Sequence, residues 1–210
     1  MASIIFDFDG TIANSFAVVV QIMQDLTHRK EVMTAEELEK LRGMNVLGIT
    51  RELHIRPWRV PMYVAVGRRR MRKHMHEIPI YPGIQGVFQD LSKDHDIYIM
   101  SSNSAQNITK FLTQHELNGY FKKIYGNVGL LGKASVLRRI MKQNGIASTD
   151  VVYIGDEVRD VEGSKLAGVP VVAVGWGYNN VEVLARHNPD KLVQNMSELS
   201  GAIRSLLRSS

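Results

Sequence analysis

SIIFDFDGT, residues 3–11, is the segment from which the rest of the chain can be interpreted. Its apolar first half predicts a buried β-strand, and Gly10 with Thr11 predicts a tight turn at the end of that strand. Two carboxylates, Asp7 and Asp9, follow the apolar run directly. Desolvating such a pair is costly, so stability alone rarely places it there. Taken by itself, the segment could also be an ordinary turn whose Asp caps the next helix.

Polar residues also follow two later strand-like runs, residues 96–100 and 151–155. A paired carboxylate can serve as nucleophile and as acid/base, with a divalent cation neutralising the pair. Ligands of open parallel sheets bind beyond the carboxyl ends of the strands, so we expect the strand ends to converge. The polar residues at these ends, and at the start of the intervening helix, are Ser101, Ser102, Asn103, Lys133, Asp156 and Asp160. Such a set suits phosphoryl transfer, which depends on positioning and charge neutralisation.

These motifs resemble those of the haloacid dehalogenase-like superfamily of phosphohydrolases, and the resemblance spans the whole chain. Four motifs stand in the family's order: DFDGT at 7–11, Ser101, Lys133 and GDEVRD at 155–160. The segment 173–179, AVGWGYN, followed by Pro189 and Asp190, is similar to the phosphoglycolate phosphatase branch.

The resemblance implies a role for each matched residue. Asp7 would be the nucleophile that forms an aspartyl-phosphate, and Asp9 the general acid/base. Ser101 would hydrogen-bond the phosphoryl group, and Lys133 would neutralise its charge. Dehalogenase members lack the second Asp of the first motif, so the presence of Asp9 argues against carbon–halogen cleavage.

The resemblance also implies a Mg²⁺ ion as cofactor. Its expected ligands are Asp7, the backbone carbonyl of Asp9, Asp156, and Asp160 either directly or through water. Glu157 lies beside Asp156 and is a further candidate, so the choice between Asp160 and Glu157 stays open.

Substrate contacts are expected from residues around these motifs and from one insert residue, Arg42, which lies in a predicted loop. Ser102 could instead cap the following helix. Arg159 is interpreted as a surface residue or an ion-pair partner. The expected substrate-binding residues are Gly10, Thr11, Arg42, Ser102 and Asn103.

The periodicity predicts an α/β fold, a Rossmann-like parallel sheet with a helical cap inserted after the first strand. Residues 14–81 are expected to form this cap, with a capping box at Thr34 and Glu37 and a long last helix from Trp58 or Met62 to His76. Residues 1–13 and 82–210 are expected to form the core, because helices and strands alternate there. Strands are predicted near 96–101, 122–126, 151–155, 170–174 and 191–193, and helices near 84–94, 104–117, 133–144, 158–168, 180–187 and 196–207.

Composition narrows the setting. The 210 residues contain no Cys, which excludes disulfides and thiol catalysis. Neither a signal peptide nor an apolar run long enough for a membrane span is found, so we expect a cytoplasmic protein without membrane contact. The net charge of +5 falls within residues 14–81, where 12 basic residues face 7 acidic ones. The run Arg68-Arg69-Arg70 could attract an anionic substrate or could simply be a solvated helix face.

Three functions compete at this point. The first is a magnesium-dependent phosphatase acting on a small anionic phosphorylated metabolite. The second is a sugar phosphomutase, which would pass the phosphoryl group to a sugar hydroxyl instead of water. The third is a non-catalytic protein that binds anions or nucleic acid through the basic insert, although the complete motif set argues against it and we do not expect nucleic acid. The substrate stays open, as does the choice between a monomer and a homodimer.

Overall fold

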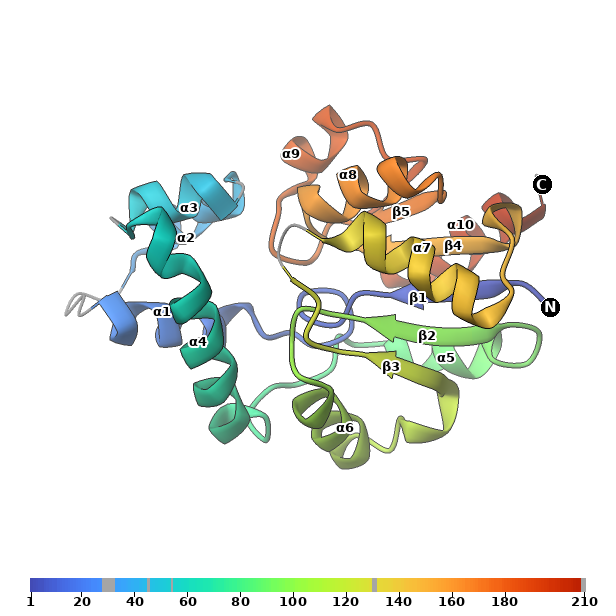
Figure 1. Cartoon of the computed structure of the whole chain (residues 1–210), viewed down its shortest axis with the longest axis horizontal. Coiled ribbons are helices and arrows are strands. Elements are labelled where there is room, and N and C mark those ends of the chain that lie inside the picture. The colour runs from blue at the N-terminus through green and yellow to red at the C-terminus, as the bar shows by residue number, and fades with distance from the viewer. Residues whose placement is uncertain (28–32, 45, 54, 130–131, 209–210) are drawn as a thin grey trace.

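A computed structural model describes residues 1–27, 33–44, 46–53, 55–129 and 132–208 of the chain. Within them, parallel strands form one sheet in the order β3-β2-β1-β4-β5-β6 (Figure 1). The strands are β1 (Ser3–Phe6), β2 (Asp96–Met100), β3 (Phe121–Tyr125), β4 (Val151–Gly155), β5 (Val171–Val174) and β6 (Lys191–Val193). The predicted parallel α/β fold is therefore confirmed.

Helices cover both faces of the sheet. One face packs against α5 (Ile84–Leu91), α6 (Ala105–Gln114) and α10 (Met196–Arg208), and the other against α7 (Lys133–Asn144), α8 (Val158–Ala167) and α9 (Val181–Arg186). Short 3₁₀ turns span Asn118–Tyr120 and Ser148–Asp150. Successive strand side chains point to opposite faces, so Ile4 and Phe6 enter one core and Ile5 the other. This burial on both sides explains why Ile4, Ile5 and Phe6 are consecutive apolar residues.

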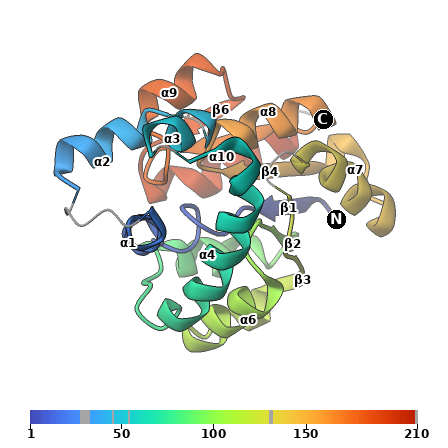
Figure 2. The ribbon, with the colours of Figure 1, turned by 60° about the vertical axis from the view of Figure 1, so that its left-hand side comes forward.

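The described residues between 14 and 81, called here the helical insert, lie beyond the carboxyl end of β1 (Figures 1 and 2). Their helices are α1 (Phe16–Thr27), α2 (Ala35–Arg42), α3 (Val46–Glu52), a 3₁₀ turn (Pro57–Arg59) and α4 (Val60–His74). The predicted capping box is present, with Glu37 N donating to Thr34 Oγ1 (3.2 Å) and Thr34 N donating to Glu37 Oε2 (2.9 Å). The last helix ends at His74 rather than His76. A small apolar cluster around Met33, Leu41, Leu53 and Ile55 stabilises the insert.

The sheet order places three motif-bearing strands side by side. β1 lies between β2 and β4, and Phe6 pairs with Ile99 on one side and Ile154 on the other. The residues that follow these strands therefore meet at one edge of the sheet, next to the helical insert. None of the described helices is long and apolar enough to cross a membrane.

Candidate active site

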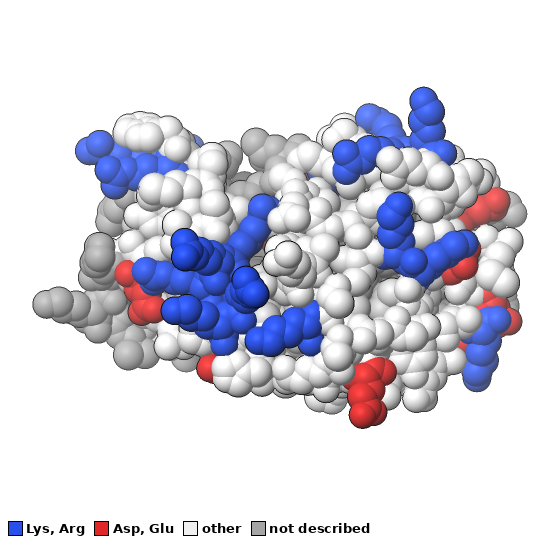
Figure 3. All heavy atoms as spheres, turned by 60° about the horizontal axis from the view of Figure 1, so that its bottom comes forward, with Lys and Arg blue, Asp and Glu red and all other residues white. Residues whose placement is uncertain are grey.

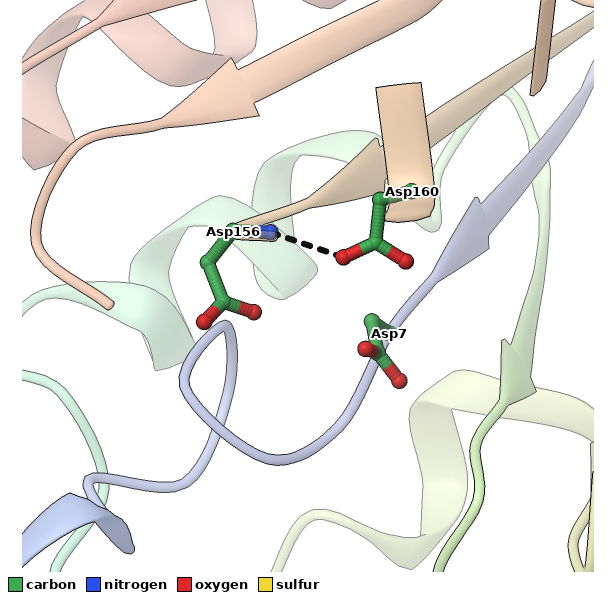
Figure 4. Close-up of side chains that lie close together, drawn as sticks. All are labelled: Asp7, Asp156 and Asp160. Atoms are coloured by element: carbon green, nitrogen blue, oxygen red, sulfur yellow. Dashed lines mark hydrogen bonds between the residues drawn. The ribbon is translucent and has the colours of Figure 1, made fainter. Parts of the chain in front are cut away.

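Three buried carboxylates converge at this edge. Asp7 follows β1, Asp156 follows β4, and Asp160 lies in the first turn of α8 (Figure 4). One oxygen from each lies within 4.8 Å of the others. Asp7 is 1% exposed and the other two are fully buried. Burial of this much negative charge requires compensation by cations.

Lys133, the first residue of α7, supplies one positive charge. Its Nζ donates to Asp7 Oδ2 (2.8 Å) and pairs with Asp160 Oδ1. Burial opposes the charged ammonium, but attraction by Asp160 and Asp7 leaves the pKa of Lys133 raised. A cation at a helix N-terminus is unfavourable by itself, and the two carboxylates explain why one is found here.

The acidic cluster carries more charge than Lys133 neutralises. Burial raises the pKa of Asp7 to about 7, although Lys133 opposes this shift. Burial and the neighbouring Glu157 raise the pKa of Asp156 well above its usual range. Asp156 accepts hydrogen bonds from Thr11 Oγ1 (2.8 Å) and the backbone N–H of Tyr178 (2.7 Å), and no cationic side chain of the described residues bonds to it. An all-oxygen site with excess negative charge fits a hard divalent cation such as Mg²⁺.

Asp160 and Glu157 are already engaged by protein groups. Asp160 Oδ1 accepts from Tyr153 Oη (3.1 Å) as well as Lys133, and its Oδ2 accepts from the backbone N–H groups of Asp156 (3.2 Å) and Glu157 (2.9 Å). Glu157 Oε1 accepts from Arg159 Nε (2.9 Å). The ion-pair interpretation of Arg159 thus agrees with the structure, but its guanidinium is largely buried, with 17% of the side chain exposed.

Asp9 lies apart from this cluster and has neutral hydrogen-bond partners. Ser15 Oγ donates to its Oδ1 (2.9 Å), and Asn103 Nδ2 donates to its Oδ2 (3.1 Å). Burial raises the pKa of Asp9, and these two hydrogen bonds only partly oppose the shift. A carboxyl group whose protonated form is favoured by burial suits a general acid.

The remaining predicted residues lie either beside the strand ends or along a cavity that includes Asp9. Ser101 is buried after β2, and its Oγ accepts from the backbone N–H of Asn103 (3.1 Å). Ser102 lines a cavity that also includes Asp9. Gly10 has φ +80°, and a Cβ there would overlap the Asp156 carboxylate. Gly10 and Thr11 therefore shape the surroundings of Asp156, where no bulkier turn residue would fit.

Arg42, unlike Ser102 and Asn103, does not line this cavity in the described part of the structure. Its Nη1 donates to the carbonyl of Gly177 (2.8 Å), and its guanidinium lies 4.3 Å from the ring centroid of Phe16. Arg42 therefore ties the insert to the loop that follows β5.

Several participants were missed by sequence reasoning. Tyr153 lies inside an apolar run and resembles an ordinary core residue, yet its hydroxyl contacts both Lys133 and Asp160. Ser15 lies outside the recognisable motif, and its hydroxyl contacts both Asp9 and Tyr178 Oη (2.9 Å). Local sequence carries no signal for these contacts, because each joins segments that only the fold brings together.

Comparison with known proteins identifies relatives of the whole chain. A phosphoglycolate phosphatase from Synechococcus elongatus is 31% identical over 213 residues, covering 99% of this chain and 100% of that protein. A 5'-nucleotidase from Pseudomonas aeruginosa is 23% identical, covering 97% and 96%. Among solved structures, a haloacid dehalogenase-like family hydrolase from Streptococcus pneumoniae superposes with a TM-score of 0.79 at 20% identity, covering 96% and 97%. These similarities confirm the likeness to the phosphoglycolate phosphatase branch.

The family assignment rests on the extent of the match as well as on the motifs. Residues 4–174 match the family model of haloacid dehalogenase-like hydrolases. The match includes the three strand ends, Lys133 and the entire helical insert. This chain therefore belongs to the haloacid dehalogenase-like hydrolase family.

Proposed function

We propose that this chain is a magnesium-dependent phosphatase that hydrolyses a small, phosphoglycolate-like phosphorylated metabolite through an aspartyl-phosphate on Asp7. The observation that carries the proposal is that two neighbouring carboxylates, Asp7 and Asp9, have different hydrogen-bond partners. Asp7 contacts the ammonium of Lys133, whereas the hydrogen-bond donors to Asp9 among the described residues are neutral. Such a difference separates a nucleophile from an acid, because the ammonium bonded to Asp7 favours its ionisation directly.

In the first half-reaction, a carboxylate oxygen of Asp7 attacks phosphorus while the bond to the leaving oxygen breaks. Asp9 gives its proton to that oxygen, so the leaving group departs as an alcohol. Lys133 and Ser101 stabilise the charge and the orientation of the phosphoryl group. Ser15 and Asn103 hold the Asp9 carboxyl toward the leaving oxygen.

In the second half-reaction, Asp9 is a carboxylate and accepts a proton from water. The oxygen of that water attacks phosphorus, the bond between phosphorus and Asp7 breaks, and inorganic phosphate is released. Asp9 is then protonated and Asp7 ionised, as at the start. The same two residues therefore complete both steps.

Mg²⁺ would be held by Asp7 and Asp156, together with the backbone carbonyl of Asp9 and with Asp160 directly or through water. Bound there, the ion would neutralise the cluster and the charge of the phosphoryl group. Asp160 would act mainly by orienting Lys133 and the backbone around Asp156, since its oxygens already accept four hydrogen bonds.

The helical insert would act as a cap on a core made of residues 1–13 and 82–210. Its helices α1 and α4 contribute many of the apolar side chains of the cavity that begins at Asp9. Closure over a bound substrate would exclude bulk water during phosphoryl transfer.

A panel of phosphorylated metabolites incubated with Mg²⁺ tests the proposal. Release of inorganic phosphate, lost in Asp7→Asn, is the expected result. Conversion of a sugar phosphate to its isomer without phosphate release would identify a phosphomutase instead. Tight binding of anions or nucleic acid without turnover of any phosphorylated compound would identify a binding protein.

A further inference from the structure

A cavity of about 250 Å³ connects Asp9 with the interior of the helical insert. Apart from the polar end near Asp9, most of its described lining consists of apolar side chains from the insert, among them Ile22, Met23 and Leu53. Asp7, Ser101 and Lys133 are not part of that lining. Since Asp9 would protonate the leaving oxygen, the cavity lies on the leaving-group side of the reaction rather than on the phosphoryl side.

Two cationic side chains line the described part of this cavity, one from each side of the cleft. Arg68 comes from α4 of the insert, and Arg159 from α8 of the core. Each has one buried nitrogen, Arg68 Nε and Arg159 Nη1, that lacks a hydrogen-bond partner among the described residues. An unpaired buried guanidinium N–H is costly, so a ligand oxygen at this place would be favourable.

The position of Arg68 is tied to the proposed acid by a chain of hydrogen bonds. Asn107 Nδ2 donates to the backbone carbonyl of Arg68 (3.1 Å) and to Asn103 Oδ1 (2.9 Å). Asn103 in turn donates to Asp9. The middle of α4, which carries Arg68, is therefore fixed relative to Asp9, even though the two belong to different parts of the chain.

The charges at the polar end of the cavity favour an anion. Arg159 pairs with Glu157, whereas the side chain of Arg68 donates, among the described residues, only to the neutral carbonyl of Val128 (3.2 Å). Burial and repulsion from Arg159 lower the pKa of Arg68, with Asp9 opposing this. Two guanidinium groups that line one cavity repel each other, and an anionic group bound between them would offset this repulsion.

We propose that Arg68 and Arg159 bind a carboxylate carried by the leaving group of the substrate. The inference rests on the proposed phosphatase function and names the two residues that would select substrates whose leaving group carries a carboxylate. A planar guanidinium matches the two oxygens of a carboxylate in a way that Lys does not. Binding of the carboxylate would also favour closure of the cap, because its two cationic partners come from the insert and from the core.

The test compares two esters of the same size, phosphoglycolate and its amide, in which a neutral carboxamide replaces the carboxylate. The wild-type enzyme is expected to prefer the carboxylate by about tenfold or more in kcat/KM, the range for hydrogen bonds to charged groups. Arg68→Met should bring this ratio close to one by slowing the carboxylate ester much more than the amide ester. Arg69→Met is the matched control, since its side chain is exposed one position along the same helix.

Arg159→Met should narrow the same ratio, and circular dichroism would verify its folding because the change leaves Glu157 without its partner. Arg68→Lys should restore only part of the preference. Equal losses on both esters in Arg68→Met, or no wild-type preference, would overturn the inference while leaving the phosphatase function intact. A wild-type enzyme that hydrolyses neither ester nor any other phosphate ester would overturn the proposed function, and this inference with it.

Discussion

The strand-end cluster and the helical insert differ in where their charged side chains lie. In the cluster, Asp7, Lys133 and Asp160 are buried and directly paired. In the insert, exposed cations gather on α4, as the space-filling view of that side shows (Figure 3), and the interior beneath them is apolar. Paired buried charges tolerate little change, whereas an apolar cavity can be reshaped. We therefore expect the chemistry at the sheet edge and the substrate selectivity in the insert.

The largest effect is expected from Asp7→Asn, which tests the role of the strand-end cluster directly. An amide cannot form the acyl-phosphate, so kcat should fall about 10⁴-fold or more. Thermal unfolding should change little, because Lys133 keeps its ion pair with Asp160. Phosphate release and circular dichroism check both parts, with the exposed Asp150→Asn as control. Near-wild-type turnover in Asp7→Asn would remove the covalent mechanism.

Removal of the metal is expected to act nearly as strongly. Chelation should abolish turnover, and Asp156→Asn should raise the Mg²⁺ concentration needed for half-maximal activity about tenfold or more. The reason is that Asp156 contributes negative charge that no cationic side chain bonded to it offsets among the described residues. A Mg²⁺ titration of activity measures the shift. An enzyme that stays fully active after exhaustive chelation would contradict the metal site.

The stability of the metal-free protein should depend on pH in a direction set by Asp7. Its pKa is about 7 in the folded protein against an ordinary value of 3.8. Between these values the folded state holds a proton that the unfolded state lacks, so stability falls as pH rises through 7. The slope is about 1.4 kcal/mol per pH unit for one full proton.

Thermal unfolding in chelator at pH 6 and pH 8 checks this dependence. Asp7→Asn should flatten the profile, because the titrating carboxyl is gone, and Mg²⁺ should raise the melting temperature more at pH 8 than at pH 6. A wild-type protein that becomes more stable toward pH 8 in chelator, with the same profile in Asp7→Asn, would show that Asp7 is ionised throughout.

A smaller and more selective effect is expected from filling the insert cavity. Gly67 lines the cavity on α4, and a Cβ there would have no neighbour within 4 Å. Gly67→Leu should therefore lower kcat/KM for esters with large leaving groups more than for small ones. Gly86→Leu on α5 is the control, since Gly86 has equally open surroundings and does not line the cavity. A uniform loss across leaving-group sizes would break the assignment of selectivity to the insert.

The smallest effect is expected from the exposed cations of α4. Replacing Arg69 and Arg72 together with Met should lower kcat/KM only a few-fold, and only at low salt, because a Debye length of about 10 Å at 0.1 M screens exposed charges. Measurements at two ionic strengths check this. An unchanged kcat/KM at low salt would indicate that this face of α4 is an ordinary solvated surface. A fall in kcat alone would indicate an effect on cap closure.

The sheet, its helices and the positions of the motif residues could be predicted with few errors. Apolar runs of three to five residues that end at turn residues are shorter than typical helices, and their length therefore favours buried strands. The capping box at Thr34 was equally predictable from the sequence, because its partners lie three residues apart. The end of α4 was misplaced by two residues, because Met75, at its C-terminus, is buried and continues the apolar pattern.

The sequence by itself determined the chemical groups of the candidate site: two carboxylates after β1, a lysine and a second acidic pair, each placed at the end of a strand or the start of a helix. Tertiary structure alone decided which partners each group has. It placed Tyr153 on Lys133, Ser15 on Asp9, and Arg42 on Gly177, away from the cavity. It also separated Arg68 from Arg69, although the two are neighbours in one basic run. The physical reason is that a helix turns about 100° per residue, so identical neighbours meet different surroundings once the helix packs.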